Sequence, residues 1–417
     1  MKTIKLIILL VIVATMSFFI SCNKSEKENV IERASYIELQ PQARAILKQS
    51  NSFAIDFFKA VSQQQEDNLF ISPYSVSAVL GMLYNGAEGE TKSEIAKVLG
   101  MSNYTSEDVS KSYYELTEAL LAADPKTSLS LANAIWANAN KGVTLKESFI
   151  DLNKSYYDAE VSTLDFSQSL ALKTINDWGN KKTNGIIPEI LEGIDPATIV
   201  ILANAIYFKS TWTDGFDKSE TELKPFHNIN GSISMVPMMY KEDYQDNYDI
   251  LYAQMDLCGM VTLPYSNKAF AMNLILPSDG VDLDALIEEL DGEYWQAMIA
   301  HRASAEVTLF MPSFKIENRL NLASVLTGMG MPLAFSKNAN FSNMTDVQAS
   351  ISGVLQKSYI SVDEAGTEAA VVTATVMSYG PVPNPQKVTV VLDRPFIFSI
   401  TEQSTGAILF MGKVTEL

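Results

Sequence analysis

The chain is poor in the residues that metal and cofactor chemistry needs. Its 417 residues include two cysteines and two histidines, His227 and His301, and neither histidine belongs to a pattern such as H-E-x-x-H or a Cys/His cluster. No G-x-S-x-G, G-x-x-x-x-G-K-[ST] or strand-associated G-x-G-x-x-G occurs. Spacing alone does not exclude a Ser-His-Asp triad, because triads assemble across a fold. We nevertheless expect no metal, no cofactor and no enzymatic activity.

Positive charge is also in deficit. The chain has 31 Lys and Arg residues against 49 Asp and Glu residues, which gives a net charge of -18. Such an excess of negative charge disfavours binding to nucleic acid or to anionic lipid. We therefore expect no nucleic-acid partner.

The N-terminus holds the one long apolar run, from Leu6 to Ile20, preceded by Lys2 and Lys5. This run is too short for a stop-transfer helix and is typical of a secretory signal. Ser21 directly before Cys22 resembles a bacterial lipobox, although Phe19 stands where that motif usually has leucine. We expect residues 1–21 to be a signal peptide and Cys22 to be lipidated, with plain signal cleavage nearby as the alternative. The predicted location is the bacterial outer membrane, on the cell surface or the periplasmic face.

Cysteine content also limits how the body is held together. Lipidation of Cys22 would leave Cys258 without a partner, so no internal disulfide forms and the core alone must stabilise the fold. The polar, mixed-charge stretch within residues 22–44 predicts a flexible tether. Residues 45–417 contain no linker or repeat, which favours one domain, or two tightly interwoven lobes, in a monomer.

Hydrophobic periodicity changes along this body. Apolar residues between 45 and 99 recur at helical spacings. Apolar or alternating runs bounded by Gly, Pro and Asp dominate later, at 199–208, 259–264, 271–277, 307–316, 388–400 and 407–414. Helices early and strands late predict an α+β fold rather than alternating βαβ units.

A strand-like segment near the C-terminus is ended like a loop. Residues 362–384 read VDEAGTEAAVVTATVMSYGPVPN, in which β-branched residues follow one another and no charge follows Glu368. Gly380, Pro381 and Pro383 then prevent continuation as a central strand. The pattern predicts a segment that becomes a strand only under some condition.

Nine motifs in order resemble the serpin family. They are Asn68–Ser75, Asn85–Thr91, Asn204–Lys209 with Trp212, Phe216, Thr221 and Phe226, Val236–Met239, Leu263–Tyr265 with Leu276–Pro277, Met311–Phe314, Gly330–Phe335, Asp393–Phe398 and Leu409–Gly412. The resemblance implies three β-sheets, eight or nine helices and an exposed reactive loop over about 364–384. It also implies the function of a suicide substrate: a target protease cleaves the loop, the loop inserts into the large sheet, and the acyl-enzyme is trapped.

The expected hinge of this loop suits insertion. Its residues are Glu364, Gly366, Thr367, Glu368, Ala369 and Ala370. Strand alternation puts Thr367 and Ala369 on one small, buriable face, whereas Glu368 falls on the other face. Non-inhibitory relatives tend to carry bulky, charged or proline residues here, so inhibition is favoured. A non-inhibitory serpin acting as a binding protein or chaperone is the alternative, and a nutrient-binding envelope lipoprotein is a remote third.

The scissile bond is expected within residues 376–380. The seventeenth residue counted from Glu364 is Gly380, but Pro381 after it blocks most serine proteases. Tyr379-Gly380 is therefore the first candidate bond, Met377-Ser378 the second, and Val376 the third, for elastase-like enzymes. The expected partners are chymotrypsin-like, elastase-like or subtilisin-like serine proteases, with cysteine proteases as a further class.

The resemblance also implies a cluster that controls opening of the sheet. Ser72, Ser75 and Asn204 match its hydrogen-bonding residues, and Trp212 matches the aromatic residue at the insertion point. Gln356 stands where the family commonly has histidine. Glutamine both donates and accepts without titrating, which removes one source of pH dependence.

Overall fold

A computed structural model describes residues 34, 36–195, 197–243, 249–367 and 386–417. These residues contain nine α-helices: α2 (Pro41–Ser62), α3 (Pro73–Gly86), α4 (Gly89–Val98), α5 (Ser106–Ala122), α6 (Glu147–Tyr157), α7 (Ser169–Lys182), α8 (Leu283–Glu289), α9 (Gly292–Ala300) and α10 (Ala323–Met329). Short 3-10 turns occur at η1 (Ala139–Lys141), η2 (Lys218–Glu220) and η3 (Pro332–Phe335).

The strands form two sheets. The ten-stranded sheet has the order β1 (Leu69–Ile71), β16 (Ile408–Val414), β15 (Phe396–Glu402), β9 (Phe270–Pro277), β8 (Cys258–Pro264), β7 (Leu251–Gln254), β10 (Ala303–Pro312), β6 (Ile233–Asp243) and β5 (Glu222–His227), and β14 (Gln386–Val391) pairs with β10. The six-stranded sheet has the order β11 (Phe314–Asn321), β12 (Ile351–Asp363), β13 (Gly366–Thr367), β4 (Val200–Thr211), β2 (Ser128–Asn138) and β3 (Glu160–Leu164).

A narrow connection divides the ten-stranded sheet. Among the described residues, its two parts are joined only where Ala303 and Ser304 of β10 pair with Tyr252 and Leu251 of β7. Counted as separate parts, these and the six-stranded sheet make three sheets. The predicted α+β class, with three sheets and eight or nine helices, is confirmed.

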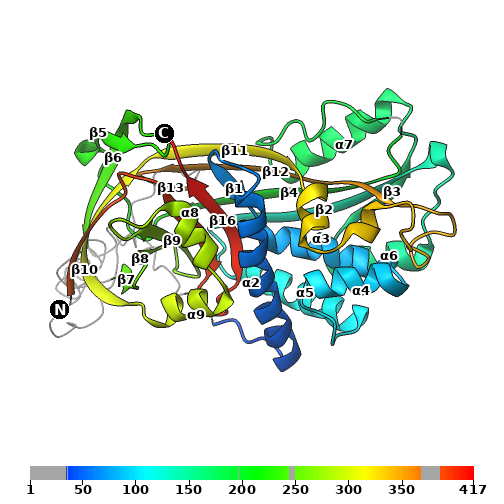
Figure 1. Cartoon of the computed structure of the whole chain (residues 1–417), viewed down its shortest axis with the longest axis horizontal. Coiled ribbons are helices and arrows are strands. Elements are labelled where there is room, and N and C mark those ends of the chain that lie inside the picture. The colour runs from blue at the N-terminus through cyan, green and yellow to red at the C-terminus, as the bar shows by residue number, and fades with distance from the viewer. Residues whose placement is uncertain (1–33, 35, 196, 244–248, 368–385) are drawn as a thin grey trace, which may run out of the picture. The chain divides into compact units, whose positions relative to one another are not determined.

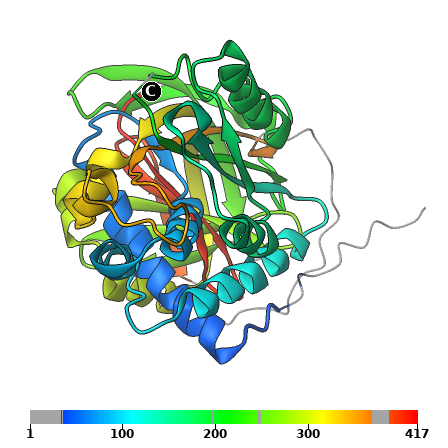
Figure 2. The same ribbon diagram turned by 90° about the vertical axis from the view of Figure 1, so that its right-hand side faces the viewer.

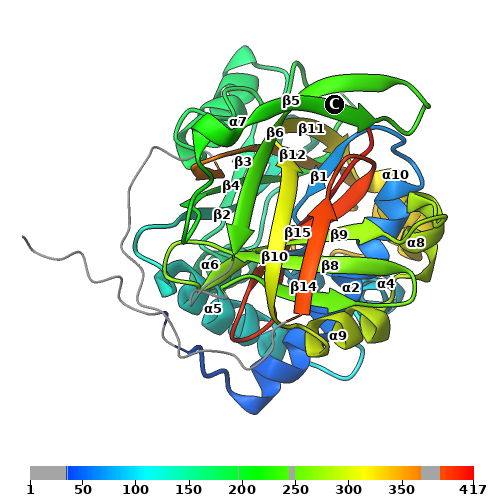
Figure 3. The same cartoon turned by 90° about the vertical axis from the view of Figure 1, so that its left-hand side faces the viewer.

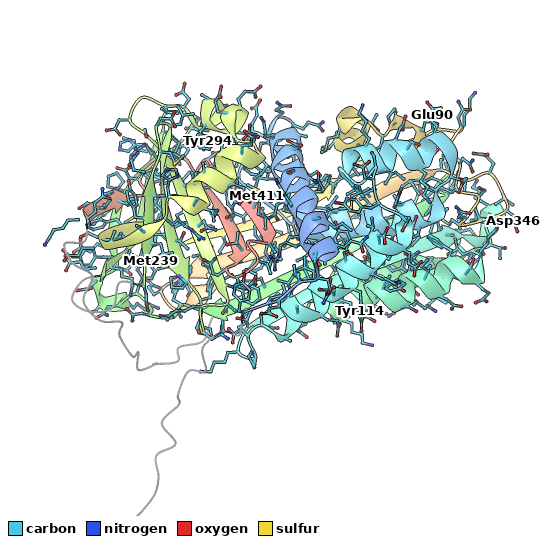
Figure 4. The ribbon with its side chains drawn as sticks, turned by 90° about the horizontal axis from the view of Figure 1, so that it is seen from below. Glu90, Tyr114, Met239, Tyr294, Asp346 and Met411 are labelled. Atoms are coloured by element: carbon cyan, nitrogen blue, oxygen red, sulfur yellow. The ribbon has the colours of Figure 1, made fainter. Side chains whose placement is uncertain are left out.

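Helices cover both faces of the six-stranded sheet (Figures 1 and 2). On one face, α3 is buried along almost its whole length and packs against β2 and β4, because it is apolar on every side. On the other face, Ile175 and Trp178 of α7 pack in one cluster with Trp136 and Ile201 of the sheet. Seen from below, Met239 of β6 lies on the opposite side of the body from Tyr114 of α5 (Figure 4).

The packed body begins earlier than the predicted boundary at residue 45. Helix α2 starts at Pro41, whose fixed φ suits the first helical position. Ile37 and Leu39 are already buried, and the Ile37 N–H donates to the Ser404 hydroxyl at 3.0 Å. Residues 37–44 are therefore part of the body rather than of a tether, and residues 22–33 lie outside the described part.

Strands and helices are also less separated along the chain than predicted. β2 and β3 come early and α8, α9 and α10 come late. The sequence prediction missed β12, although it forms one wall of the site below. In the described part of the chain, no helix has the length and apolar character needed to cross a membrane.

Candidate functional site: a hinge at the open end of the six-stranded sheet

The six-stranded sheet is parted at one end. β12 and β4 pair in parallel from Ile351 and Val200 to Lys357 and Ala205. Beyond that point they separate, and β13 lies between their ends, antiparallel to both (Figure 1). The sheet thus has an opening whose mouth is occupied by a strand of two residues.

Thr367 is the inner residue of this short strand. It pairs with Val362 of β12 and Ser210 of β4, and its side chain is 0% exposed. Its hydroxyl lies 2.7 Å from the hydroxyl of Tyr265. Burial raises the pKa of the Tyr265 phenol, so this pair stays neutral at physiological pH. Strand alternation predicts that Thr367 lies on the buriable face of the hinge, and the structure places it inside the sheet.

Gly366 precedes it where only glycine fits. Its φ is +151°, a conformation that side chains rarely adopt. A Cβ atom at this position would lie 2.2 Å from the Ser210 carbonyl oxygen and 2.7 Å from Cα of Thr211. Glycine is therefore required for the chain to enter between β12 and β4.

The turn before β13 is fixed by hydrogen bonds. The Asp363 carboxylate accepts from the N–H groups of Ala365 at 2.9 Å and Gly366 at 3.2 Å. The Glu364 carboxylate accepts from the Thr221 hydroxyl at 2.8 Å, and the Glu364 carbonyl accepts from the Phe216 N–H at 2.9 Å. The start of the predicted loop at 364 is thus anchored to the body, and Glu364 is held in a turn.

Trp212 lies directly beside this turn. Its ring stacks on Tyr265 with centroids 4.4 Å apart and planes at 12°. Its indole N–H donates to the Asp363 carbonyl at 2.9 Å, and its backbone N–H donates to the Ala365 carbonyl at 3.0 Å. The stack and the two bonds hold both sides of the hinge turn.

A second group of polar side chains lies where the pairing of β4 and β12 ends. Gln356 stands opposite Asn204, one pair before the last. The side-chain oxygen Oε1 of Gln356 accepts from the Ser72 N–H at 3.1 Å, and the side-chain nitrogen Nε2 donates to the Ser72 carbonyl at 3.1 Å. A longer contact of 3.5 Å joins the amide to Asn204 Oδ1. Both functions of the glutamine are used, as its predicted donor and acceptor role requires.

Ser72 joins this group to α3, which it caps. Its hydroxyl donates to the Leu409 carbonyl at 2.7 Å and accepts from the Ser75 N–H at 3.3 Å. Within the described residues, the Ser75 hydroxyl has no hydrogen-bond partner, so Ser75 takes part through its backbone. The Asn204 amide donates to Asn133 Oδ1 at 2.7 Å and so links β4 to β2.

Several predicted residues lie outside the described part of the chain. They are Cys22, the hinge residues Glu368, Ala369 and Ala370, and the scissile-bond candidates Val376, Met377, Ser378, Tyr379 and Gly380.

Tyr265, Asp363, Thr221 and Asn133 contribute to the site, but sequence reasoning gave them no role. Tyr265 ends the Leu263–Tyr265 motif, and Thr221 belongs to the motif that begins at Asn204. Both residues could therefore have been selected from the sequence. Their contacts with the hinge depend on residues more than 100 positions away, which no local pattern reports.

Side chains that could bind a metal do not gather in the described part of the chain, and its one cysteine there is buried. Across the ranges that the structure describes, no three His, Cys, Asp or Glu side chains come together as a metal site. Cys258 is buried and free, and burial raises the pKa of its thiol to about 11.

The described residues define an α+β protein whose mixed sheet is parted at one end and holds the two-residue strand β13 in the opening. The sequence pattern of the serpin family (serine protease inhibitor) matches residues 48–417. The chain belongs to the serpin family. Most serpins inhibit proteases and are not catalysts, although some members are not inhibitors.

Relatives come from distant organisms. An uncharacterised serpin-like protein of Thermococcus kodakarensis is 32% identical over 89% of this chain and 86% of its own length. Serpin B6 of Pongo abelii is 33% identical over 88% of this chain and 98% of its own length.

Solved serpin structures share the fold. The native thermophilic serpin tengpin is 30% identical, with a TM-score of 0.81, covering 93% of this chain and 97% of tengpin. Human thyroxine-binding globulin in complex with thyroxine is 28% identical, with a TM-score of 0.79, covering 90% of this chain and 99% of the globulin.

Proposed function

We propose that this serpin is a suicide-substrate inhibitor of serine proteases that traps the acyl-enzyme by inserting its cleaved loop between β4 and β12. The observation that carries the proposal is the position of Thr367, which is buried in the sheet as the first residue of the insertable segment. The residues that follow are small or β-branched and, after Glu368, uncharged as far as Lys387.

The geometry gives insertion a path. β13 runs antiparallel to both neighbours, so its continuation would run down the opening between β4 and β12. Complete insertion must break the parallel pairing that ends at Lys357 and Ala205. The Gln356 and Asn204 side chains lie one pair inside that end, so they would be among the first groups disturbed.

The energy favours insertion once the loop is cut. Adding about a dozen residues to the sheet contributes roughly 6 to 18 kcal/mol from ladder hydrogen bonds, at about 0.5 to 1.5 kcal/mol each. This is comparable to the whole stability of an ordinary domain, about 5 to 15 kcal/mol. A state with the loop outside the sheet would therefore persist kinetically rather than by equilibrium stability.

The sequence of the loop directs the proposal to particular proteases. Tyr379-Gly380 suits chymotrypsin-like enzymes and avoids the Gly380-Pro381 bond, Met377-Ser378 is the second candidate bond, and Val376 suits elastase-like enzymes. Cleavage at Met377 shortens the inserted strand by comparison with Tyr379, which would pull the protease less far. We place the protein at the bacterial envelope, anchored through a lipid on Cys22, on the strength of Ser21-Cys22 after the apolar run.

The test is to mix the purified protein with chymotrypsin, elastase, subtilisin and trypsin and to look for a complex that survives SDS. The released C-terminal peptide is then sequenced. A complex with a peptide starting at Gly380 supports inhibition through Tyr379. Clean cleavage with no covalent complex would contradict inhibition and favour a binding protein or chaperone of the same fold.

A further inference from the structure

The hairpin of β5 and β6 has an outward face without charge. Their antiparallel register pairs Leu223 with Pro237, Pro225 with Met235 and His227 with Ile233. These six outward side chains, named here the apolar ribbon, are all exposed. His227 is the only polar member, and none of the six is Lys, Arg, Asp or Glu.

The exposure of the ribbon is large for apolar side chains. Leu223 is 66% exposed, and Ile233 and Met235 are each 60% exposed. On the inward face of the same strands Phe226, Val236 and Met238 are buried, so the hairpin also has a core face. A second apolar face on a two-stranded ribbon marks a surface for contact.

The ribbon starts next to the hinge. Thr221, one residue before β5, donates its hydroxyl to the carboxylate of Glu364, two residues before Gly366. The chain that returns after residue 385 enters β14, which pairs with β10, and β10 pairs with β6. Both ends of the reactive loop are therefore attached to the structure that carries the ribbon (Figure 3).

One other use of this surface is less consistent with the structure. Pro225 in the middle of β5 lacks an N–H group, which opposes addition of another strand to this edge.

We propose that the apolar ribbon is a second docking surface for the target protease, which adds to the contacts of the reactive loop and selects proteases with an apolar patch beside the active-site cleft. The inference rests on the proposed inhibitory function. Uncharged aliphatic and methionine side chains are the composition of the buried centre of a protein interface rather than of its rim. Docking here makes the association rate depend on the ribbon but leaves the later insertion step unchanged.

The test compares two double variants of the full chain. Leu223→Lys with Met235→Lys places charge on the ribbon, and Leu170→Lys with Val347→Lys changes exposed apolar residues on α7 and after α10. For the protease that the wild type inhibits fastest among chymotrypsin, elastase, subtilisin and trypsin, we expect the ribbon variant to associate roughly tenfold more slowly. The control should keep the wild-type rate, and both variants should keep the wild-type stoichiometry of inhibition. Equal rates for the two double variants with all four proteases overturn the inference.

A binding measurement separates this inference from the proposed function. Each protease is also prepared with its catalytic serine replaced by alanine, and its dissociation constant is measured against both double variants and the wild type. Tighter binding of the wild type than of the ribbon variant, without any covalent complex of the active protease, keeps the docking surface and rejects inhibition. A covalent complex that forms equally fast with the wild type and the ribbon variant keeps the inhibitory function and rejects the docking surface. A wild-type dimer that the ribbon variant converts to a monomer assigns the ribbon to a second copy and overturns the inference.

Discussion

The hydroxyl of Tyr265 lies 2.7 Å from the hydroxyl of Thr367, at the mouth of the parted sheet. Both side chains are fully buried, and the tyrosine ring is stacked on Trp212. This contact joins the end of β8 to the first residue of the insertable segment. A small number of contacts holds the hinge in this position, so single substitutions at these contacts should have measurable effects.

Replacing Thr367 by arginine should convert an inhibitor into a substrate. The side chain at this position is 0% exposed, and an arginine would bring a charge without a partner into the sheet. Insertion should then be slow relative to hydrolysis of the acyl-enzyme, and the stoichiometry of inhibition should rise roughly tenfold or more. Titration of active protease against inhibitor measures this stoichiometry. Thr144→Arg, on an exposed threonine, is the matched control, and an unchanged stoichiometry in Thr367→Arg would contradict the proposed role.

Tyr265→Phe and Thr367→Val should each destabilise the protein, and the two changes should not add. Each single variant leaves one buried hydroxyl without its partner, at a cost of about 1 to 3 kcal/mol. The double variant removes both hydroxyls and should recover about 1 kcal/mol of that cost. Urea unfolding of all four proteins completes the cycle. If the losses in unfolding free energy of the two single variants simply add in the double variant, the 2.7 Å contact contributes nothing to stability.

Gly366→Ala should expel the hinge from the sheet. Its Cβ would lie 2.2 Å from the Ser210 carbonyl oxygen, and the φ of +151° adds strain. We expect a loss of about 1 to 3 kcal/mol, as for other overpacked positions. Limited proteolysis should cut the variant after residue 365 faster than the wild type. Gly193→Ala is the control, because its new Cβ would have no atom within 4 Å.

Gln356→His should introduce a pH dependence that the wild type lacks at this position. Neutral histidine can both accept from and donate to Ser72, as the glutamine does, whereas the charged form can only donate. Burial lowers the pKa of such a histidine below its unfolded value of about 6.5, so the unfolded state binds more protons. Stability is then present above pH 6.5 and is lost as the pH falls below it.

Thermal unfolding at pH 8 and pH 5.5 checks this prediction. When the pH is lowered from 8 to 5.5, the midpoint temperature of unfolding should fall clearly more for Gln356→His than for the wild type. Equal shifts for the two proteins would show that residue 356 has no part in the pH response.

Motif order and loop composition made much of the fold and part of the site predictable. Hydrophobic periodicity implied the α+β class, the resemblance carried by the nine motifs implied three sheets, and the same resemblance pointed to Asn204, Gln356 and Ser72. The strand β12 was missed because its alternation is interrupted by Gly353 and polar residues. The boundary at residue 45 was placed too late, because burial of Ile37 and Leu39 depends on packing against distant parts of the chain.

The sequence by itself determined that this protein is a serpin, and it determined the chemistry of the insertable segment, since both depend on residue type and order along the chain. Only the tertiary structure decided that Gly366 and Thr367 already lie between β4 and β12, because that position depends on Ser210, Tyr265 and Trp212. It also decided that one face of the β5–β6 hairpin is apolar and uncovered. Alternation fixes which side chains share a face, but only the surrounding packing fixes which face meets solvent.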